Sequence, residues 1–485
     1  MDFISNLPEP ILHHIMSMLP DKDAAGTCVL SKAWNHTHST FPILVFNESR
    51  YVKYHDKYNV DRENLPTKRK QFYDYVDNTL LWFHIQGLSI QQLKLWLNFN
   101  DRVIKSAIIH HIDYWIELAM ECNVQVLDLT LYGVANLHPN SVRYCMPWSV
   151  ALLRSLVKLC LDGCISLDEE FLIFPIEFSS LKVLSLVRVH FGDKRVFQNL
   201  LSSCPCIEYI NLSSCVGIDS VCIQGLSKLK EVKISGNIMG IEIDAPTLQS
   251  FHFSRGRVDI HNTIKINKCV NLKELSLICF NITHQWFLQH CHLFSSIQTL
   301  ELKFCTMPHR VNVSFPQLKI IKLQNCDTLG NAYIDAARLY KCSFIYSSAS
   351  NMLPMVSFVN CSTQLEISVK LCIHGYAGAF DYCKLKEFFL ELQCRNVSAI
   401  ISLWNIEGDF VLQENELHDF SIQPPLLKHL HLYFLCEKDV SFSLVTSLLW
   451  SCHPSIISCR LSNRKLIKVC DCANVSLFDF LEELF

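Results

Sequence analysis

The chain has 485 residues, more than the roughly 100–200 residues of an ordinary domain, which predicts more than one structural part. Half of the residues are hydrophobic and only 18% are charged, a composition that excludes a largely disordered chain. The 43 Lys and Arg nearly balance the 46 Asp and Glu, so the net charge is −3. This balance gives no electrostatic reason to expect nucleic acid or an anionic membrane as the main partner.

The first fifty residues predict three short helices. Between Pro8 and Pro20, apolar residues recur at helical spacing, namely Ile11, Leu12, Ile15, Met18 and Leu19. Asp21 is the expected N-cap of a second helix, and Ser31 that of a third helix that carries Trp34. Helices this short bury too little surface to be stable alone, so the segment is expected to complete its core against a partner.

The stretch from Asn47 to about Lys70 is polar and mixed in charge. Its basic run Lys68–Lys70 is compatible with nuclear import, but so short a run favours a solvated turn before a helix over Gln71–Phe83.

From Val124 onward, a short apolar pattern, L-x-x-L-x-L with Val, Ile or Phe substituting, returns at near-constant intervals. Nine clear copies begin at Val124, Leu156, Leu181, Ile207, Leu229, Leu248, Leu272, Ile297 and Leu318. Their start-to-start spacings run from 19 to 32 residues, and all but the first lie at or near the roughly 20–29-residue period of a leucine-rich repeat. Weaker copies begin at Leu339, Leu385 and near Leu427, and a last one precedes Leu461.

Each repeat is too small to bury its own apolar face, so neighbours must stack into one continuous core. The expected fold is therefore α/β: an N-terminal three-helix domain, then a leucine-rich-repeat solenoid. Parallel strands would line its concave face, with helices such as Lys194–Cys204 or irregular segments outside. The residues between the apolar positions must face away from the core. They form the candidate substrate-binding row, Tyr209, Asn211, Glu231, Lys233, His252, Glu274, Glu301, Lys303 and Lys322.

Four of the 24 cysteines stand at one defined position of these repeats. Cys164, Cys215, Cys305, Cys326 and Asn237 each stand three residues after the last apolar position, in the N/C slot of the leucine-rich consensus. There the side chain is expected to turn inward and bind backbone groups. Zinc is the alternative role for cysteine, but no pair of C-x-x-C motifs at zinc-finger spacing supports it. Neither a metal nor any other cofactor is expected.

The sequence contains no phosphate-binding glycine loop, nucleophile elbow or zinc-protease motif, so no catalytic residue and no enzymatic activity are expected. No secretory signal is recognisable in MDFISNLPEP, and no apolar run approaches the length that spans a bilayer. We therefore expect a protein of the cytoplasm, the nucleus or both, with reduced thiols.

The segment ISNLPEPILHHIMSMLPDKDAAGTCVLSKAWN resembles an F-box, whose pattern runs L-P-x-x-I-L, then I-x-x-x-L-P, then D-A-x-x-T-x-x-L-S-K-x-W. The residues in register are Leu7, Pro8, Ile11, Leu12, Ile15, Leu19, Pro20, Asp23, Ala24, Thr27, Leu30, Ser31, Lys32 and Trp34. One departure is Asn35–His38, where basic and aromatic residues are usual. With the repeats, the whole chain resembles the plant F-box/leucine-rich-repeat (RNI-like) proteins, substrate receptors of SCF-type cullin–RING ubiquitin ligases. His111–Leu129 resembles the leading helix and first repeat strand of that family.

This resemblance implies an F-box over residues 1–47, a helical linking segment over 48–120, leucine-rich repeats over 121–345, and irregular C-terminal repeats with a cap over 346–485. The F-box would bind an SKP-type adaptor, and through it a cullin–RING core, while the repeats would bind an unknown substrate protein. The adaptor-binding candidates are Leu7, Pro8, Ile11, Leu12, Ile15, Leu19, Pro20 and Trp34. The alternative is a leucine-rich-repeat binding scaffold or intracellular receptor outside ubiquitin chemistry, and the F-box is the feature that separates the two.

Overall fold

The computed structural model describes residues 4, 7–52, 65–99, 102–133, 142–256, 263–326, 328–347, 354–361, 364–376, 382–392, 396–407, 426–435, 453–461 and 467–471. The chain forms two compact units, Met1–Thr247 and Leu248–Phe485. None of the described helices is long and apolar enough to cross a membrane.

The first unit begins with the three predicted helices, joined by one 3-10 turn: α1 (Glu9–Ser17), α2 (Asp21–Gly26), η1 (Thr27–Val29) and α3 (Lys32–Ser39). Pro8 precedes α1 at its N-cap, and Ser31 caps α3 by accepting a 3.2 Å hydrogen bond from the Trp34 amide. The cap of α2 differs from the expectation, because Pro20 holds the N-cap position and Asp21 is already the first helical residue.

A parallel sheet follows, in the strand order β1 (Ile43–Asn47), β2 (Gln92–Asn98), β3 (Val126–Tyr132), β5 (Lys158–Gly163), β7 (Val183–Val187), β9 (Tyr209–Ser213) and β11 (Glu231–Gly236). Register places apolar residues opposite one another from strand to strand. Leu95, Leu129, Leu161, Leu186 and Leu212 form one such buried ladder. Because β1 and β2 pair ahead of β3, the sheet starts earlier in the chain than the expected first repeat strand.

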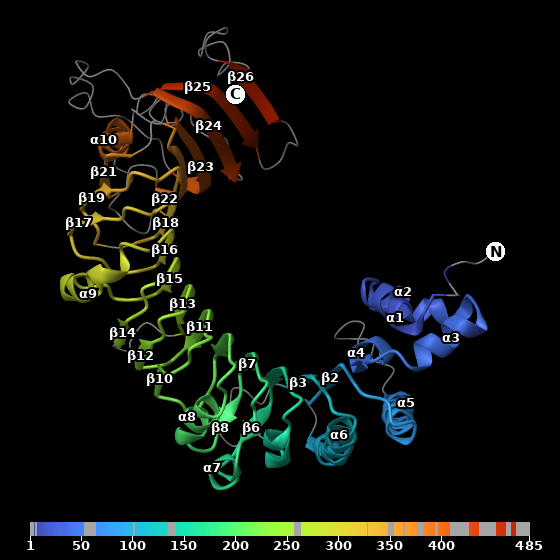
Figure 1. Cartoon of the computed structure of the whole chain (residues 1–485). Helices are drawn as coiled ribbons and strands as arrows, with labels where there is room; N and C mark the ends of the chain where they lie inside the picture. The colour runs from blue at the N-terminus through green and yellow to red at the C-terminus, as the bar shows by residue number, and fades with distance from the viewer. Residues whose placement is uncertain are drawn as a thin grey trace. The chain divides into compact units, whose positions relative to one another are not determined.

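Helices and shorter strands lie beside this sheet (Figure 1). The helices are α4 (Glu48–Tyr51), α5 (Leu65–Ile85), α6 (Arg102–Glu121), η3 (Trp148–Leu152), α7 (Glu170–Ile173) and α8 (Arg195–Ser202). The short strands are β4 (Tyr144–Cys145), β6 (Ile165–Leu167), β8 (His190–Phe191), β10 (Ser220–Gln224) and β12 (Gly240–Asp244). They pair in parallel, β4 with β6, β6 with β8, and β10 with β12. Each repeat thus gains a second short strand where an irregular segment was expected, while α8 confirms the outer helix expected over Lys194–Cys204.

The basic run Lys68–Lys70 lies inside α5, so its interpretation as a solvated turn is wrong. Arg69 points into the protein, where its Nε donates a 2.7 Å bond to Glu48 Oε1 of α4. The second oxygen of Glu48 accepts the Asn98 amide of β2 at 2.6 Å. One buried carboxylate therefore joins α4, α5 and the end of β2.

The second unit repeats this plan. Its parallel sheet runs β13 (Ser250–Arg255), β15 (Glu274–Ile278), β16 (Thr299–Lys303), β18 (Ile320–Gln324), β20 (Lys341–Ser347), β22 (Glu366–Tyr376), β23 (Asn396–Glu407), β24 (Leu426–Leu435) and β25 (His453–Leu461). The last strand, β26 (Ile467–Asp471), pairs antiparallel with β25. The remaining elements are β14 (Thr263–Asn267), α9 (His284–His290), η4 (Cys291–Leu293), β17 (Arg310–Ser314), β19 (Asn331–Asp335), β21 (Met355–Val359) and α10 (Tyr382–Leu392).

All nine clear copies of the apolar pattern overlap strands of the two sheets, and so do the weaker copies near Leu339, Leu427 and Leu461. The copy at Leu385 is wrong, because LKEFFL lies in helix α10. Its buried residues Leu385, Phe388, Phe389 and Leu392 follow the i, i+3, i+4, i+7 spacing of a helix face. A six-residue apolar match cannot distinguish that face from a strand.

Candidate functional site

The three N-terminal helices hold a small apolar core. Leu12 and Met16 of α1 pack with Trp34 of α3, and Ile15 and Phe41 lie partly buried against them. At 3% and 6% exposure, Leu12 and Trp34 lie in this core and not on the surface, although both were candidates for adaptor contact. Leu12 and Trp34 therefore hold α1 in place, while the opposite face of α1, which carries Ile11, is exposed.

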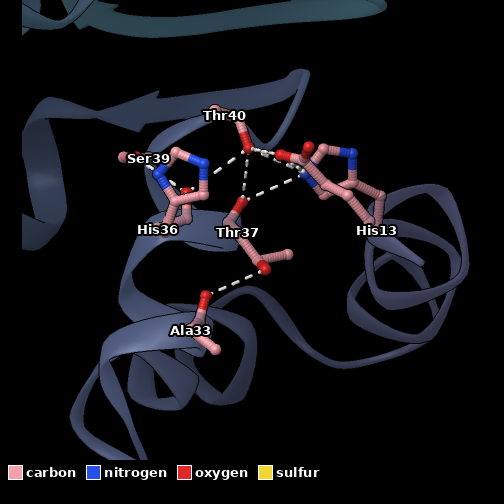
Figure 2. Close-up of polar contacts among 7 residues, drawn as sticks. His13, Ala33, His36, Thr37, Ser39 and Thr40 are labelled. Carbon is pink, nitrogen blue, oxygen red and sulfur yellow. Dashed lines mark hydrogen bonds and ion pairs between the residues drawn. The ribbon is translucent and has the colours of Figure 1, made fainter. Parts of the chain in front are cut away.

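A group of polar contacts joins α1 to the end of α3 (Figure 2). His13 Nε2 lies 3.1 Å from the Thr37 carbonyl and 3.2 Å from Thr40 Oγ1, and Thr40 also donates to Glu9. Thr37 Oγ1 donates back to the Ala33 carbonyl at 3.0 Å. The residues Asn35–His38, where this chain departs from the usual F-box pattern, thus lie beside a contact that fixes the two helices against each other.

The other adaptor-binding candidates are more accessible. Leu7, Pro8, Ile11, Leu19 and Pro20 are exposed, and Ile15 is half-buried. Sequence reasoning missed three further exposed apolar residues, Met18, Val29 and Leu30, of which Val29 is 83% exposed. Leu30 was in register with the F-box pattern, so that pattern could have identified it.

The candidate substrate row in the first unit lies on the outward side of β9 and β11. Tyr209 stands opposite Glu231, and Asn211 opposite Lys233. Lys233 Nζ contacts Glu231 Oε1 at 2.7 Å and lies 5.4 Å from the centre of the Tyr209 ring. The hydrogen bond to Glu231 raises the pKa of Lys233. These residues therefore form one contiguous polar patch whose charges are already paired.

In the second unit, the candidate residues lie on β13, β15, β16 and β18. Glu301 lies at their centre, 3.0 Å from Lys303 Nζ and 3.6 Å from Lys322 Nζ, and it also accepts from the nearly buried Ser276. Burial opposes ionisation of Glu301, but the bonds from Lys303 and Ser276 outweigh it and lower the pKa of the carboxyl. Elsewhere in the row, Ser250 contacts both His252 and Glu274.

A further polar patch on the first sheet was missed. Asp128 of β3 stands opposite Lys94 of β2 and Cys160 of β5. Burial raises the pKa of Asp128, and the nearby lysines oppose that rise. Close to it, Arg188 Nη2 donates a 2.5 Å bond to Asp162 Oδ1. The alternation that located the row from Tyr209 onward also applies to β2, β3 and β5, so the sequence did contain this signal.

The cysteines of the repeat consensus occupy the expected inward position. Cys164, Cys305 and Cys326 are buried, and Cys215 is half-buried. The Cys215, Cys305 and Cys326 thiols donate to the carbonyl oxygens of Leu186, Leu277 and Leu302, at 3.3, 3.3 and 3.4 Å. Each acceptor holds the last position of the L-x-x-L-x-L pattern in the preceding repeat, so one thiol links two adjacent repeats. Asn237 departs from this arrangement, because it is exposed.

Burial raises the pKa of Cys215 to about 12 and that of Cys305 to about 11, which keeps both thiols protonated and unreactive. Among the described residues, no three His, Cys, Asp or Glu are placed to hold a metal ion.

One cluster has the composition of a hydrolase triad but not its geometry. Ser166 and His190 stand opposite each other on β6 and β8, with Ser166 Oγ 3.3 Å from His190 Nδ1. Asp168 accepts a hydrogen bond from Ser166 itself. In a triad, the carboxylate orients the histidine, which then takes the serine proton. Here the carboxylate holds the serine, so this arrangement does not activate a nucleophile.

Comparison with known families agrees with this structure. The profile of the family described as "At1g61320/AtMIF1, LRR domain" matches residues 84–366, and that of the F-box domain matches residues 4–37. Within the fold, these ranges cover α1 to α3 and the parallel strands from β2 to the start of β22. The chain belongs to the plant F-box/leucine-rich-repeat proteins of this family.

Individual relatives come from Arabidopsis thaliana. The putative F-box protein At3g58860 is 25% identical over 89% of this chain and 98% of its own length. The F-box/LRR-repeat protein At3g58900 is 28% identical over 56% of this chain and 78% of its own length. The putative F-box/LRR-repeat protein At3g58880 is 27% identical over 52% of either chain.

Proposed function

We propose that this protein is the non-catalytic substrate-recognition subunit of an SCF-type ubiquitin ligase. Its F-box docks on an SKP-type adaptor, and its repeats hold the target protein. The observation that carries this proposal is the division of apolar residues in the F-box. Leu12, Met16 and Trp34 form the core, while Ile11, Met18 and Val29 remain exposed on a domain of three short helices. Ile11 and Met18 are seven positions apart on α1 and its C-cap, so they share one face, and an exposed apolar face is typical of a surface that a partner covers.

The mechanism requires no reactive group on this chain. A receptor that binds both adaptor and target raises the local concentration of target lysines near a ubiquitin-conjugating enzyme. The receptor therefore accelerates the transfer without a catalytic group of its own. Such a ligase would act in the cytoplasm, the nucleus or both.

The outward strand residues support a polar protein segment as the target. Glu231, Lys233, Glu301 and Lys303 present both charge signs in pairs, and Tyr209 adds one aromatic surface. A segment with complementary charges can exchange partners with these pairs, whereas an apolar ligand would leave them desolvated without compensation.

Affinity purification read by mass spectrometry tests the adaptor half of the proposal. Replacing Leu7 and Pro8 together by alanine should abolish recovery of the adaptor while target proteins are retained. Ile173→Ala, at an exposed apolar residue of α7, is the matched control and should change nothing. Undiminished adaptor recovery from the double variant would favour the alternative, a binding scaffold or intracellular receptor outside ubiquitin chemistry.

The target half is tested on the lysines of the row. Charge reversal of Lys233, Lys303 and Lys322 together should reduce target capture and leave adaptor recovery intact. Reversal also places like charges beside Glu231 and Glu301, so a second variant exchanges Glu231 with Lys233, which form an ion pair with each other. This exchange keeps both charges next to each other and inverts the pattern that the target meets on β11. If both variants captured the target as well as the wild-type chain does, the target site would lie outside this row.

A further inference from the structure

A cavity of about 450 Å³ lies within the first unit, where the F-box helices meet β1 and α5. Met16 and Leu19 close it from the end of α1, and residues of β1 and α5 form the opposite wall. Helix α2 contributes only Ala24 and Ala25, whose small side chains leave the space open. This volume falls within the roughly 300–1,000 Å³ of small-molecule sites.

The lining is apolar and rich in aromatic rings. Phe41, Phe46, Tyr75, Trp82 and Phe83 all border the cavity, and Tyr75 and Trp82 are about half exposed. Among the described residues that line it, there is no lysine, arginine, aspartate or glutamate. A charged ligand would therefore lose its hydration without gaining an ionic partner.

Besides the tyrosine, five polar side chains border the same space: Ser17, His38 and Ser39 from the F-box helices, and Asn78 and Thr79 on α5. Ser17, Ser39 and Thr79 already donate to backbone carbonyl groups of their own helices. Burial lowers the pKa of His38, so its ring is neutral at pH 7. A neutral imidazole can donate a hydrogen bond at one nitrogen and accept one at the other. Apolar walls with a few polar groups are the usual composition of a site that orients a small molecule.

We propose that this cavity binds an uncharged, planar aromatic small molecule that carries one hydroxyl or amide group. The rings supply stacking surfaces, and His38, Asn78 or Thr79 supplies the polar contact. Such a ligand would touch all three F-box helices together with β1 and α5, and would therefore fasten the F-box to the first strand of the sheet. The site requires neither adaptor nor target and goes beyond the function proposed above; of the adaptor-binding candidates, only Leu19 lines it.

The test is calorimetric titration of the full chain with 2-naphthol, and with 2-naphthoate as the charged probe of the same ring size. We expect saturable binding of one 2-naphthol per chain and at least about tenfold weaker binding of 2-naphthoate, a difference of about 1.4 kcal/mol. Thr79→Phe fills the cavity and should weaken 2-naphthol at least about tenfold. Thr67→Phe, at an exposed position of the same helix, is the matched control and should bind as wild type does.

If Thr79→Phe does not fold, Ala25→Phe fills the cavity from the side of α2 and tests the same point. Absence of saturable 2-naphthol binding, equal binding by the filled and control variants, or equal affinity for 2-naphthoate would each overturn the proposal. Loss of 2-naphthol binding on addition of an SKP-type adaptor would also overturn it, because the cavity would then belong to the adaptor interface.

Discussion

The buried ion pair between Glu48 and Arg69 predicts a large and local loss of stability when it is broken. The two side chains are 1% and 9% exposed, and their 2.7 Å bond lies next to the 2.6 Å bond from the Asn98 amide. Glu48→Ala removes the buried carboxylate that binds both the Arg69 guanidinium and the Asn98 amide. Breaking one partner of a buried pair costs about 3–5 kcal/mol, so local opening of α5 and β2 should increase by a factor of roughly 10³.

A second ion pair of the same unit provides the matched control. Arg154 Nε and Glu177 Oε2 also lie 2.7 Å apart, but both side chains are far more exposed. Hydrogen exchange followed by mass spectrometry, on peptides that cover α5 and β2, measures the local opening. Glu177→Ala should cause no measurable change in its own peptides. Equal effects of Glu48→Ala and Glu177→Ala would refute the reasoning, because distance and not burial would then set the cost.

Two further predictions concern buried side chains of the repeats. Alkylation of the native protein should modify the exposed Cys291 before Cys305 or Cys326, and preferential labelling of Cys305 would contradict its inward position. Cys305→Ala, which removes the bond to the Leu277 carbonyl, should lower the free energy of unfolding by about 1–2 kcal/mol. His290 accepts the Ile266 amide at Nε2, and burial lowers its pKa below the ordinary 6.5, so its stabilising contribution is complete above pH 6.5 and lost as the pH falls below that value. Exchange protection of the Ile266 amide, corrected for intrinsic rates, should fall between pH 7 and 5 in wild type but not in His290→Gln, and a fall of equal size in both would contradict this role.

Much of the fold could be predicted because it repeats. An alternation such as that of β9, in which Ile210 and Leu212 are buried between half-buried neighbours, recurs at near-constant spacing and needs no knowledge of distant contacts. The strand β22 was missed because Gln364 stands at the first position of the pattern, three residues before Ile367, and β23 because Ala399 takes the last position, which a larger apolar residue holds elsewhere. The short strands β4, β6 and β8 are two or three residues long and too brief for any periodicity.

The candidate surfaces were predicted less completely. Alternation identifies which residues of a strand face outward, as for Lys233 and Lys303, but the pairing of both with neighbouring glutamates depends on side-chain conformation. Helical spacing likewise placed Ile11 and Leu12 on one helix without telling which of them the core would cover. Arg69 shows the limit most clearly, because its buried partner Glu48 lies 21 positions away.

The central claim is that the exposed apolar face of the F-box binds an SKP-type adaptor. Calorimetric titration of the full chain with a purified SKP-type adaptor tests it most directly, with Ile11→Asp as the variant and Ile173→Asp on α7 as the control. We predict one adaptor per chain, unchanged binding by the control, and at least about 100-fold weaker binding by Ile11→Asp, because a carboxylate would be buried without a partner. No binding by the wild-type chain, or equal binding by all three proteins, would contradict the account.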